Sequence, residues 1–372
     1  MGIGKLRTNN NEITMKKSIS YILMATALLA ASGFFSSCEK VSPQGVLMGN
    51  TSVDDRVRQS MIYYAYHGED LDWDLADSIE EYSFLVGSDS HITFDPGRLA
   101  EMIEIGIEHG DLFYCHLGDL ADTKPEYYSN TQLALYNATR TWKAKYIKPL
   151  INEYNTVDDG MYFDNRITPS TKNYLKPWDD WELPFYPVVG NHDITHNGWS
   201  LFCDQFKSSF YEFTVKVGDS YDRFIFLDSA NGTLGDFQTD EIDNNALQND
   251  DKQIRNTFTF THTNIFRPSM NEFASTYCRE ELYYLLNKLE EWDTTIAFWG
   301  HVHAWDDRMF NGVRHITMRS MNFVDHPNGG DNLIVRVTVK KDGSCEVKPV
   351  GLYCKERSKE ELESLGYYVK TI

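Results

Sequence analysis

The sequence predicts a single domain of mixed α/β class, and three observations lead to this prediction. Of the 372 residues, 41% are hydrophobic and 14% are aromatic, which is enough to bury a substantial core. Apolar runs of strand length alternate with helical patterns, beginning with strand, helix, strand between residues 82 and 119. No internal repeat or low-complexity tract divides the chain, so residues 53–372 are interpreted as one domain.

The residues before position 53 are not expected to belong to this domain. Residues 1–37 contain a basic start, an apolar middle and a small-residue end, the pattern of a secretory signal peptide whose natural start is Met15. The small-small-Cys ending resembles a bacterial lipoprotein signal. It predicts an exported protein, periplasmic or on the cell surface, anchored to the membrane only by a lipid on Cys38. Ordinary cleavage with an incidental Cys38 is the alternative, and residues 38–52 are interpreted as a polar tether.

The first elements of the domain follow from its apolar patterns. Residues 53–66 are expected to form a helix that packs against the main body. An apolar run at 82–86 has the length of a strand, residues 95–110 place apolar side chains on one helical face, and residues 112–119 form the next strand. This order favours a parallel pair of strands joined by a crossover helix.

The remaining elements add a second group of strands. Residues 129–152 have a helical pattern. A long loop follows, in which Tyr174, Trp178 and Trp181 either line a substrate pocket or pack the loop onto the core. The later elements are strands at 185–189, 223–229, 256–264 and 294–303, a helix at 279–289, and β-like runs at 313–318, 332–341 and 345–353.

Charge and cysteine usage exclude several classes of protein. The formal net charge is −20, whereas a surface built for nucleic acid needs clustered Lys and Arg, so no nucleic-acid partner is expected. Five cysteines follow Cys38, and their odd number without a C-x-x-C motif indicates neither a disulfide framework nor a zinc ribbon. Free thiols are the simpler expectation, and one disulfide in an exported protein is the alternative.

Metal-competent side chains follow nearly every predicted strand. In open α/β sheets, ligands bind beyond the carboxyl ends of the strands, so these side chains are expected to converge. Each motif alone is more simply explained as a turn, a helix N-cap or a buried histidine, but together they predict a metal site. In chain order the side chains are Asp89, His91, Asp119, Asp122, Asn191, His192, His262, His301 and His303.

The order D-x-H, G-D-x-x-D, G-N-H-D, H, G-H-x-H resembles that of the calcineurin-like metallophosphoesterases, over residues 89–303. The resemblance implies the family's β-sandwich of two mixed sheets flanked by helices, with two metal ions. By this resemblance Asp89, His91 and His303 hold one ion, Asn191, His262 and His301 hold the other, Asp119 bridges them, His192 donates the proton, and Asp122 orients His192.

The chemistry of these ligands favours the same interpretation. Two ions bridged by a carboxylate lie ~3.5–4 Å apart and clamp the attacking and leaving oxygens of an in-line displacement. Nitrogen and oxygen ligands without thiolate fit divalent or trivalent ions of manganese, iron, zinc or nickel. The sequence therefore predicts hydrolysis of a small phosphomonoester or phosphodiester by a metal-activated hydroxide, with His192 as general acid.

The sequence departs from the family's motifs at two points, and each departure argues against one subclass of the family. Thr123 and Lys124 follow Asp122, where the protein phosphatases of the family carry Arg, and Asp122 itself stands where the purple acid phosphatases carry Tyr. Both subclasses are therefore disfavoured. The rival hypothesis is a catalytically inactive surface protein that binds a phosphorylated or sugar ligand. Because a binding protein needs no acid–base pair, the presence of His192 and Asp122 favours the enzyme.

Overall fold

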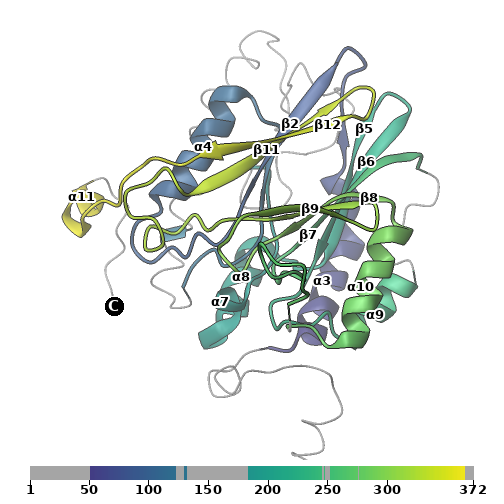
Figure 1. The fold of residues 1–372 in the computed structure, drawn as a ribbon, viewed down its shortest axis with the longest axis horizontal. Coiled ribbons are helices and arrows are strands. Elements are labelled where there is room, and N and C mark those ends of the chain that lie inside the picture. The colour runs from purple at the N-terminus through teal and green to yellow at the C-terminus, as the bar shows by residue number, and fades with distance from the viewer. Residues whose placement is uncertain are drawn as a thin grey trace, which may run out of the picture. The chain divides into compact units, whose positions relative to one another are not determined.

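Two mixed β-sheets, with helices beside them, form the fold (Figure 1). The computed structural model describes residues 51–122, 130–131, 183–244, 247, 252–274 and 276–364. The described residues all belong to one compact unit. The predicted fold class, two mixed sheets flanked by helices, is confirmed.

Some predicted segments lie outside the described residues. These are the signal peptide, most of the tether and the loop with Tyr174, Trp178 and Trp181. Of the helix predicted at 129–152, only positions 130 and 131 are described, and both are helical.

The larger sheet has seven strands in the order β1-β5-β6-β7-β8-β10-β9. Strands β6, β7, β8 and β10 run parallel, whereas β5 and β9 are antiparallel to β6 and β10. Four consecutive parallel strands bring their carboxyl ends to one edge of this sheet. The strands are β1 (Trp73–Asp74), β5 (Tyr211–Val217), β6 (Ser220–Leu227), β7 (Ile254–Thr261), β8 (Thr294–Trp299), β9 (Asp306–Phe310) and β10 (Val313–Thr317).

The smaller sheet has five strands in the order β12-β11-β2-β3-β4. Strands β2, β3 and β4 are parallel, and β2 and β3 are joined through helix α4 (Gly97–His109), as the strand–helix–strand pattern predicted. Gly110 ends α4 in a left-handed conformation with φ of 85°, which glycine adopts without a steric penalty. The strands are β2 (Glu81–Gly87), β3 (Phe113–His116), β4 (Phe185–Pro187), β11 (Leu333–Lys340) and β12 (Cys345–Gly351).

Phenylalanine rings fill the space between the sheets. Phe84 of β2 lies edge-on to Phe224 of β6, with ring centroids 5.2 Å apart, and Phe113 of β3 meets Phe213 of β5 at 5.3 Å. All four are at most 1% exposed. Fully burying one such side chain contributes roughly 1.5–3 kcal/mol, so this aromatic layer holds the two sheets in register.

Helices lie beside both sheets (Figure 1). The predicted helix at 53–66 is confirmed as α3 (Val53–His67). It packs against the larger sheet together with α10 (Arg279–Glu291) and is fixed there by the fully buried Arg56, whose guanidinium donates to Asp228 at 2.8 Å. None of the described helices is long and apolar enough to cross a membrane. The shorter helices are η1 (Gly68–Leu71), α7 (Asn191–Ile194), η3 (Thr195–Asn197), α8 (Gly198–Phe206), α9 (Asp236–Asp243) and α11 (Lys359–Ser364).

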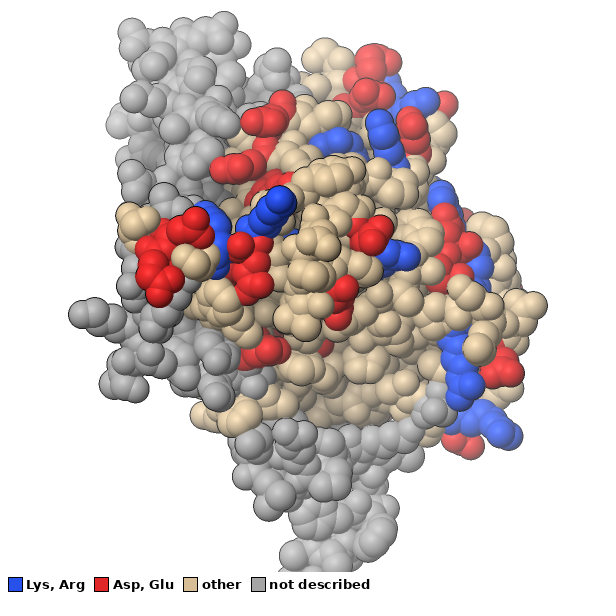
Figure 2. All heavy atoms as spheres, turned by 60° about the vertical axis from the view of Figure 1, so that its left-hand side comes forward, with Lys and Arg blue, Asp and Glu red and all other residues tan. Residues whose placement is uncertain are grey.

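The surface carries charges of both signs, and the described cysteines are unpaired. On the face drawn in Figure 2, Lys and Arg side chains are interspersed with Asp and Glu and do not gather into a basic patch. The five described cysteines are free thiols, including Cys345 and Cys354.

Candidate metal centre

The nine predicted site residues meet where parallel strands of both sheets end. The smaller sheet supplies Asp89 and His91 after β2, Asp119 and Asp122 after β3, and Asn191 and His192 after β4; the larger sheet supplies His262 after β7, and His301 and His303 after β8. Neither sheet carries the complete set, so the site depends on their packing.

One group of ligand candidates consists of Asp89, His91 and His303. The Nε2 atoms of His91 and His303 face each other at 3.1 Å, and Nε2 of His303 lies 3.3 Å from Oδ1 of the fully buried Asp89. Two ring nitrogens and a carboxylate thus point at one another, and two of the three side chains, Asp89 and His91, are buried. A cation held between them satisfies all three, and the group therefore fits a metal ion.

A second group is formed by Asn191, His262 and His301, with Asp119 beside them. Oδ1 of Asn191 lies 2.9 Å from Nε2 of His262 and 2.9 Å from Nδ1 of His301. Oδ2 of Asp119 lies 3.4 Å from His262 Nε2 and 3.6 Å from Nε2 of His91 in the first group. The Asp119 carboxylate therefore stands between the two groups, where a shared ligand would lie.

Three of the histidines among the ligand candidates have a hydrogen-bond acceptor at the ring nitrogen that points away from the other ligands. A histidine that donates through one nitrogen presents the other as a lone pair, which is the form that binds a metal. The three pairs are His91 Nδ1 with Asp122 Oδ1 at 3.0 Å, His262 Nδ1 with the Leu117 carbonyl at 2.7 Å, and His303 Nδ1 with Asp325 Oδ2 at 2.8 Å.

His192 lies beside the ligand candidates and is paired with Asp122. Its Nδ1 is 3.0 Å from Asp122 Oδ1, and its ring meets that of His91 edge-on at 4.5 Å. The hydrogen bond with Asp122 raises the pKa of His192 to about 9. Burial alone would raise the pKa of Asp122, but hydrogen bonds from His192 and His91 hold it below its usual value. The His192 ring is also close enough to His91 and Asp119 to form a third candidate ligand group with them.

The backbone is strained at most of the ligand candidates. A non-glycine residue in the left-handed region costs on the order of 1–3 kcal/mol, and such residues cluster at functional sites. Five of the seven ligand candidates have this conformation, namely Asp89 (φ 52°), His91 (φ 41°), Asp119 (φ 53°), His301 (φ 75°) and His303 (φ 55°).

Gly190 lets two of the ligand-bearing turns approach each other. A Cβ atom at this position would collide with the backbone nitrogen and the carboxylate of Asp119. The turn after β4 therefore packs directly on the turn after β3, which brings Asn191 next to Asp119.

Asp193 and Asp325 contribute to the site although the motifs gave them no role. Asp193 is fully buried. It accepts hydrogen bonds from the Gly190 N–H at 2.9 Å and from the Leu120 N–H at 3.0 Å, so it ties the two turns together. Burial and the nearby Asp119 raise the pKa of Asp193 to about 7. The sequence could have pointed to Asp193, because it is the last residue of the GNHD motif. Asp325 lies in a loop that contains no motif.

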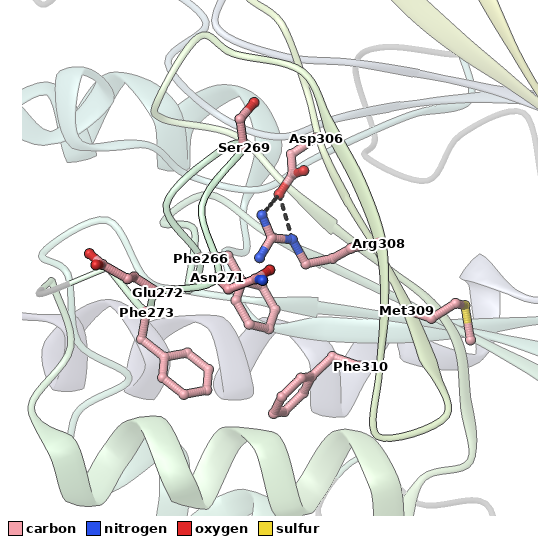
Figure 3. Close-up of a pocket in the computed structure, with 9 residues that line it drawn as sticks. All are labelled: Phe266, Ser269, Asn271, Glu272, Phe273, Asp306, Arg308, Met309 and Phe310. Carbon is pink, nitrogen blue, oxygen red and sulfur yellow. Dashed lines mark hydrogen bonds and ion pairs between the residues drawn. The ribbon is translucent and has the colours of Figure 1, made fainter.

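A separate hollow of about 460 Å³ lies beside β9 (Figure 3). Phe266, Phe273 and Phe310 contribute aromatic rings to its wall. Arg308 also lines it, but this side chain donates to Asp306 Oδ2 at 2.6 Å and to backbone carbonyls. The residues lining the hollow include none of the metal-ligand candidates.

Several solved structures are similar to this chain. A dimetal phosphatase from Danio rerio is 12% identical, with 73% of this chain and 97% of that chain covered and a TM-score of 0.45. An anchor protein of the inner membrane complex of Plasmodium is 14% identical (78% and 96% covered, TM-score 0.41), and an archaeal phosphodiesterase is 9% identical (72% and 99% covered, TM-score 0.31).

Sequence comparison gives the family. No curated protein matches the chain. The family model described as calcineurin-like phosphoesterase matches residues 82–305, which is more than half of the 372 residues and spans all nine site residues. The chain therefore belongs to the calcineurin-like phosphoesterase family.

Proposed function

We propose that the protein hydrolyses small phosphomonoesters or phosphodiesters at a centre of two metal ions. The observation that carries the proposal is the place of Asp119 between two groups of ligand candidates, with the His192–Asp122 pair beside them. Membership of a phosphoesterase family supports metal-dependent ester hydrolysis.

Seven residues of the chain would bind the two metal ions. Asp89, His91 and His303 would hold one ion, Asn191, His262 and His301 the other, and Asp119 both. When bound, the ions would activate water and withdraw charge from the phosphate. Because the amide of Asn191 is neutral, it can ligate without cancelling the positive charge that attracts a phosphate ester.

His192 would supply the proton that the leaving oxygen needs. The hydrogen bond with Asp122 raises its pKa and so favours the protonated imidazole, and about half of its side chain is exposed, so it can reach a substrate. Asp122 would stabilise the protonated ring and fix its orientation through the 3.0 Å contact. A protein that only binds a phosphorylated or sugar ligand has no use for this pair, which favours the enzyme over that rival.

The proposed location is the outside of the inner membrane, with the protein either periplasmic or on the cell surface. The support comes from the sequence alone: a signal-peptide pattern over residues 1–37 that ends in two small residues before Cys38. A lipid on Cys38 would be the only attachment to the membrane.

The test combines metal analysis with two generic substrates. Purified protein is assayed for bound metal and then for hydrolysis of p-nitrophenyl phosphate and bis-p-nitrophenyl phosphate. We expect about two ions per chain, turnover of at least one ester, loss of turnover on chelation and its return when metal is restored. Metal-loaded protein that binds phosphate but hydrolyses neither ester would instead support the binding protein.

A further inference from the structure

We propose that Asp325 is a positioning residue of the metal centre, which orients His303 as a ligand. Oδ2 of Asp325 lies 2.8 Å from Nδ1 of His303. The opposite nitrogen, Nε2, faces Asp89 Oδ1 at 3.3 Å and His91 Nε2 at 3.1 Å. Asp325 lies beyond residue 305, where the family match ends. The inference rests on the proposed metal centre, but not on the reaction catalysed there.

His303 needs this support more than His262 does. Its side chain is 30% exposed, and its backbone has a left-handed φ of 55°. By contrast, His262 is fully buried and its Nδ1 faces the Leu117 carbonyl at 2.7 Å, so its orientation is fixed by packing. An exposed imidazole can rotate and exchange its tautomer, whereas a carboxylate on Nδ1 fixes both, with Nε2 left as the lone-pair donor.

The loop that carries Asp325 is itself held by a buried arginine. Arg98 of α4 is 2% exposed, and its guanidinium lies over the ring of Phe323 at 4.2 Å. It donates to the carbonyls of Asn322 at 2.8 Å and His326 at 2.6 Å, on either side of Asp325. The main chain around Asp325 is therefore fixed before any metal binds.

The same loop is bonded to the backbone that carries Asp89. The Ser320 hydroxyl donates to the Asp89 carbonyl at 2.9 Å, and the Met321 N–H donates to the Ser88 carbonyl at 3.0 Å. Two ligand candidates of one ion, Asp89 and His303, are thus connected to a single loop. We therefore assign the effect of Asp325 to the ion held by Asp89, His91 and His303.

The test compares Asp325→Ala and Asp325→Asn with a matched control, Asp331→Asn. Asp331 lies in the same loop, has a side chain that is 74% exposed, and contacts only His326 at 3.6 Å among the ion pairs of the described residues. Metal-free protein is titrated with Mn²⁺ or Zn²⁺ to obtain the affinity for each ion, and the thermal midpoint of the metal-free protein is measured alongside.

We expect Asp325→Ala to weaken one of the two ions by about 10–100-fold, the usual loss when the acceptor of a ligating histidine is removed. The other ion, the midpoint of the metal-free protein and the Asp331→Asn control should stay at wild-type values. Asp325→Asn keeps an acceptor oxygen without its charge, so its loss should be smaller.

Two results would overturn the inference. One is an Asp325→Ala protein that binds both ions as tightly as the wild type. The other is a metal-free midpoint that falls while the affinities do not, which would make Asp325 a purely structural residue. A wild type that binds two ions but hydrolyses no ester would reject the proposed function and leave this inference intact, because the readout is binding.

Discussion

At the scale of single residues, Asp122 stands out because one of its oxygens holds two histidines. Oδ1 lies 3.0 Å from Nδ1 of His91 and 3.0 Å from Nδ1 of His192. The family resemblance implied a single role for Asp122, the orientation of His192. The contact with His91, a ligand candidate, means that the carboxylate links metal binding to the proposed proton transfer.

The first prediction separates the acid from the ligands. His192→Ala should keep both ions and lower kcat by ~10²–10⁴-fold, the usual contribution of general acid–base catalysis. The loss should shrink for an ester whose leaving group departs without a proton. Metal content and kcat for an alkyl and a nitrophenyl ester are the measurements. Loss of an ion would instead make His192 a ligand, as its closeness to His91 and Asp119 allows.

The contact of Asp122 with His91 gives this prediction a second part. At saturating metal, His192→Ala/Asp122→Asn should be scarcely slower than His192→Ala alone, since residues that act as a unit are not additive. At limiting metal the double variant should be the slower one, because the acceptor of His91 has lost its negative charge. Full multiplication of the two rate losses at saturating metal would contradict the scheme.

The second prediction concerns the shared ligand. Asp119 lies within 3.6 Å of ring nitrogens in both groups, through His91 and His262. The Asp89 carboxylate faces ring nitrogens of the first group and meets the second group through the backbone N–H of His301, at 3.1 Å. Asp119→Asn should therefore weaken both ions and nearly abolish turnover, and Asp89→Asn should weaken mainly one. Metal stoichiometry by mass spectrometry decides between them. Two tightly held ions in the Asp119 variant would rule out a bridging role.

The site residues that sequence could predict are those in ordered motifs. The structure brings all nine residues together, because each motif follows a strand and these strands of the two sheets end on the same side of the fold. Asp325 could not be predicted, since its partner His303 is distant in sequence and only the fold of the loop held by Arg98 brings them together. Asp193 could not be assigned a role because its acceptors face backbone N–H groups, which carry no sequence signal.

At the scale of elements, the apolar runs predicted most of the strands and the long helices, but three strands were not predicted: the two-residue β1, β5 and β9. Strand β5 has alternating apolar residues but also contains Glu212, which is buried and paired with Arg223 at 2.7 Å. Strand β9 begins with charged residues that look like a loop; Asp307 pairs with Arg314 of β10 at 2.7 Å. A charged residue that is paired with an opposite charge on the neighbouring strand can lie within a sheet, but it interrupts the apolar pattern by which a strand is predicted from sequence.

The third prediction belongs to the turn between β4 and α7. Gly190→Ala places a methyl group against the backbone of Asp119, and backbone cannot move aside as a flexible side chain can. We expect a loss of about 1–3 kcal/mol in the free energy of unfolding of the metal-free protein, the usual cost of overpacking. Metal affinity should fall as well, since the Asn191 and Asp119 turns are pushed apart. Chemical denaturation and metal titration measure the two effects, and wild-type values for both would show that the turns have room.

At the scale of the whole molecule, the candidate metal centre draws its ligands from both sheets. Asp89, His91, Asp119 and Asn191 come from the smaller sheet, and the other three ligand candidates from the larger one. Bound ions would therefore stabilise the packing of one sheet on the other, because they bind the folded chain and not the unfolded one.

The fourth prediction concerns the attachment of the whole molecule to a membrane. Cys38→Ala should abolish labelling by a radioactive fatty acid and release the protein from the membrane fraction, because Cys38 is the proposed site of lipidation. Labelling and fractionation of cells expressing the wild type and the variant are the measurements. A wild type that takes up no label would make Cys38 incidental.

The last prediction concerns stability against pH and rests on His315 of β10. This side chain is 2% exposed and packs against the rings of Trp299, Phe266 and Phe310. Burial lowers its pKa from 6.5 to about 4, and the positive charge of Arg308 on β9 acts in the same direction.

Between pH 6.5 and 4 the unfolded chain binds a proton at His315 that the folded chain does not. The stabilising contribution is therefore complete above pH 6.5 and is lost as the pH falls towards 4, by about 3 kcal/mol in all. His315→Phe keeps a ring but cannot be protonated, so metal-free His315→Phe should lose about 3 kcal/mol less than the wild type between pH 7 and pH 4. His315→Leu should share this reduced slope while differing in stability at pH 7, which separates charge from ring packing. Denaturation curves at several pH values provide the measurement, and an unchanged slope in both variants would show that the acid sensitivity arises elsewhere.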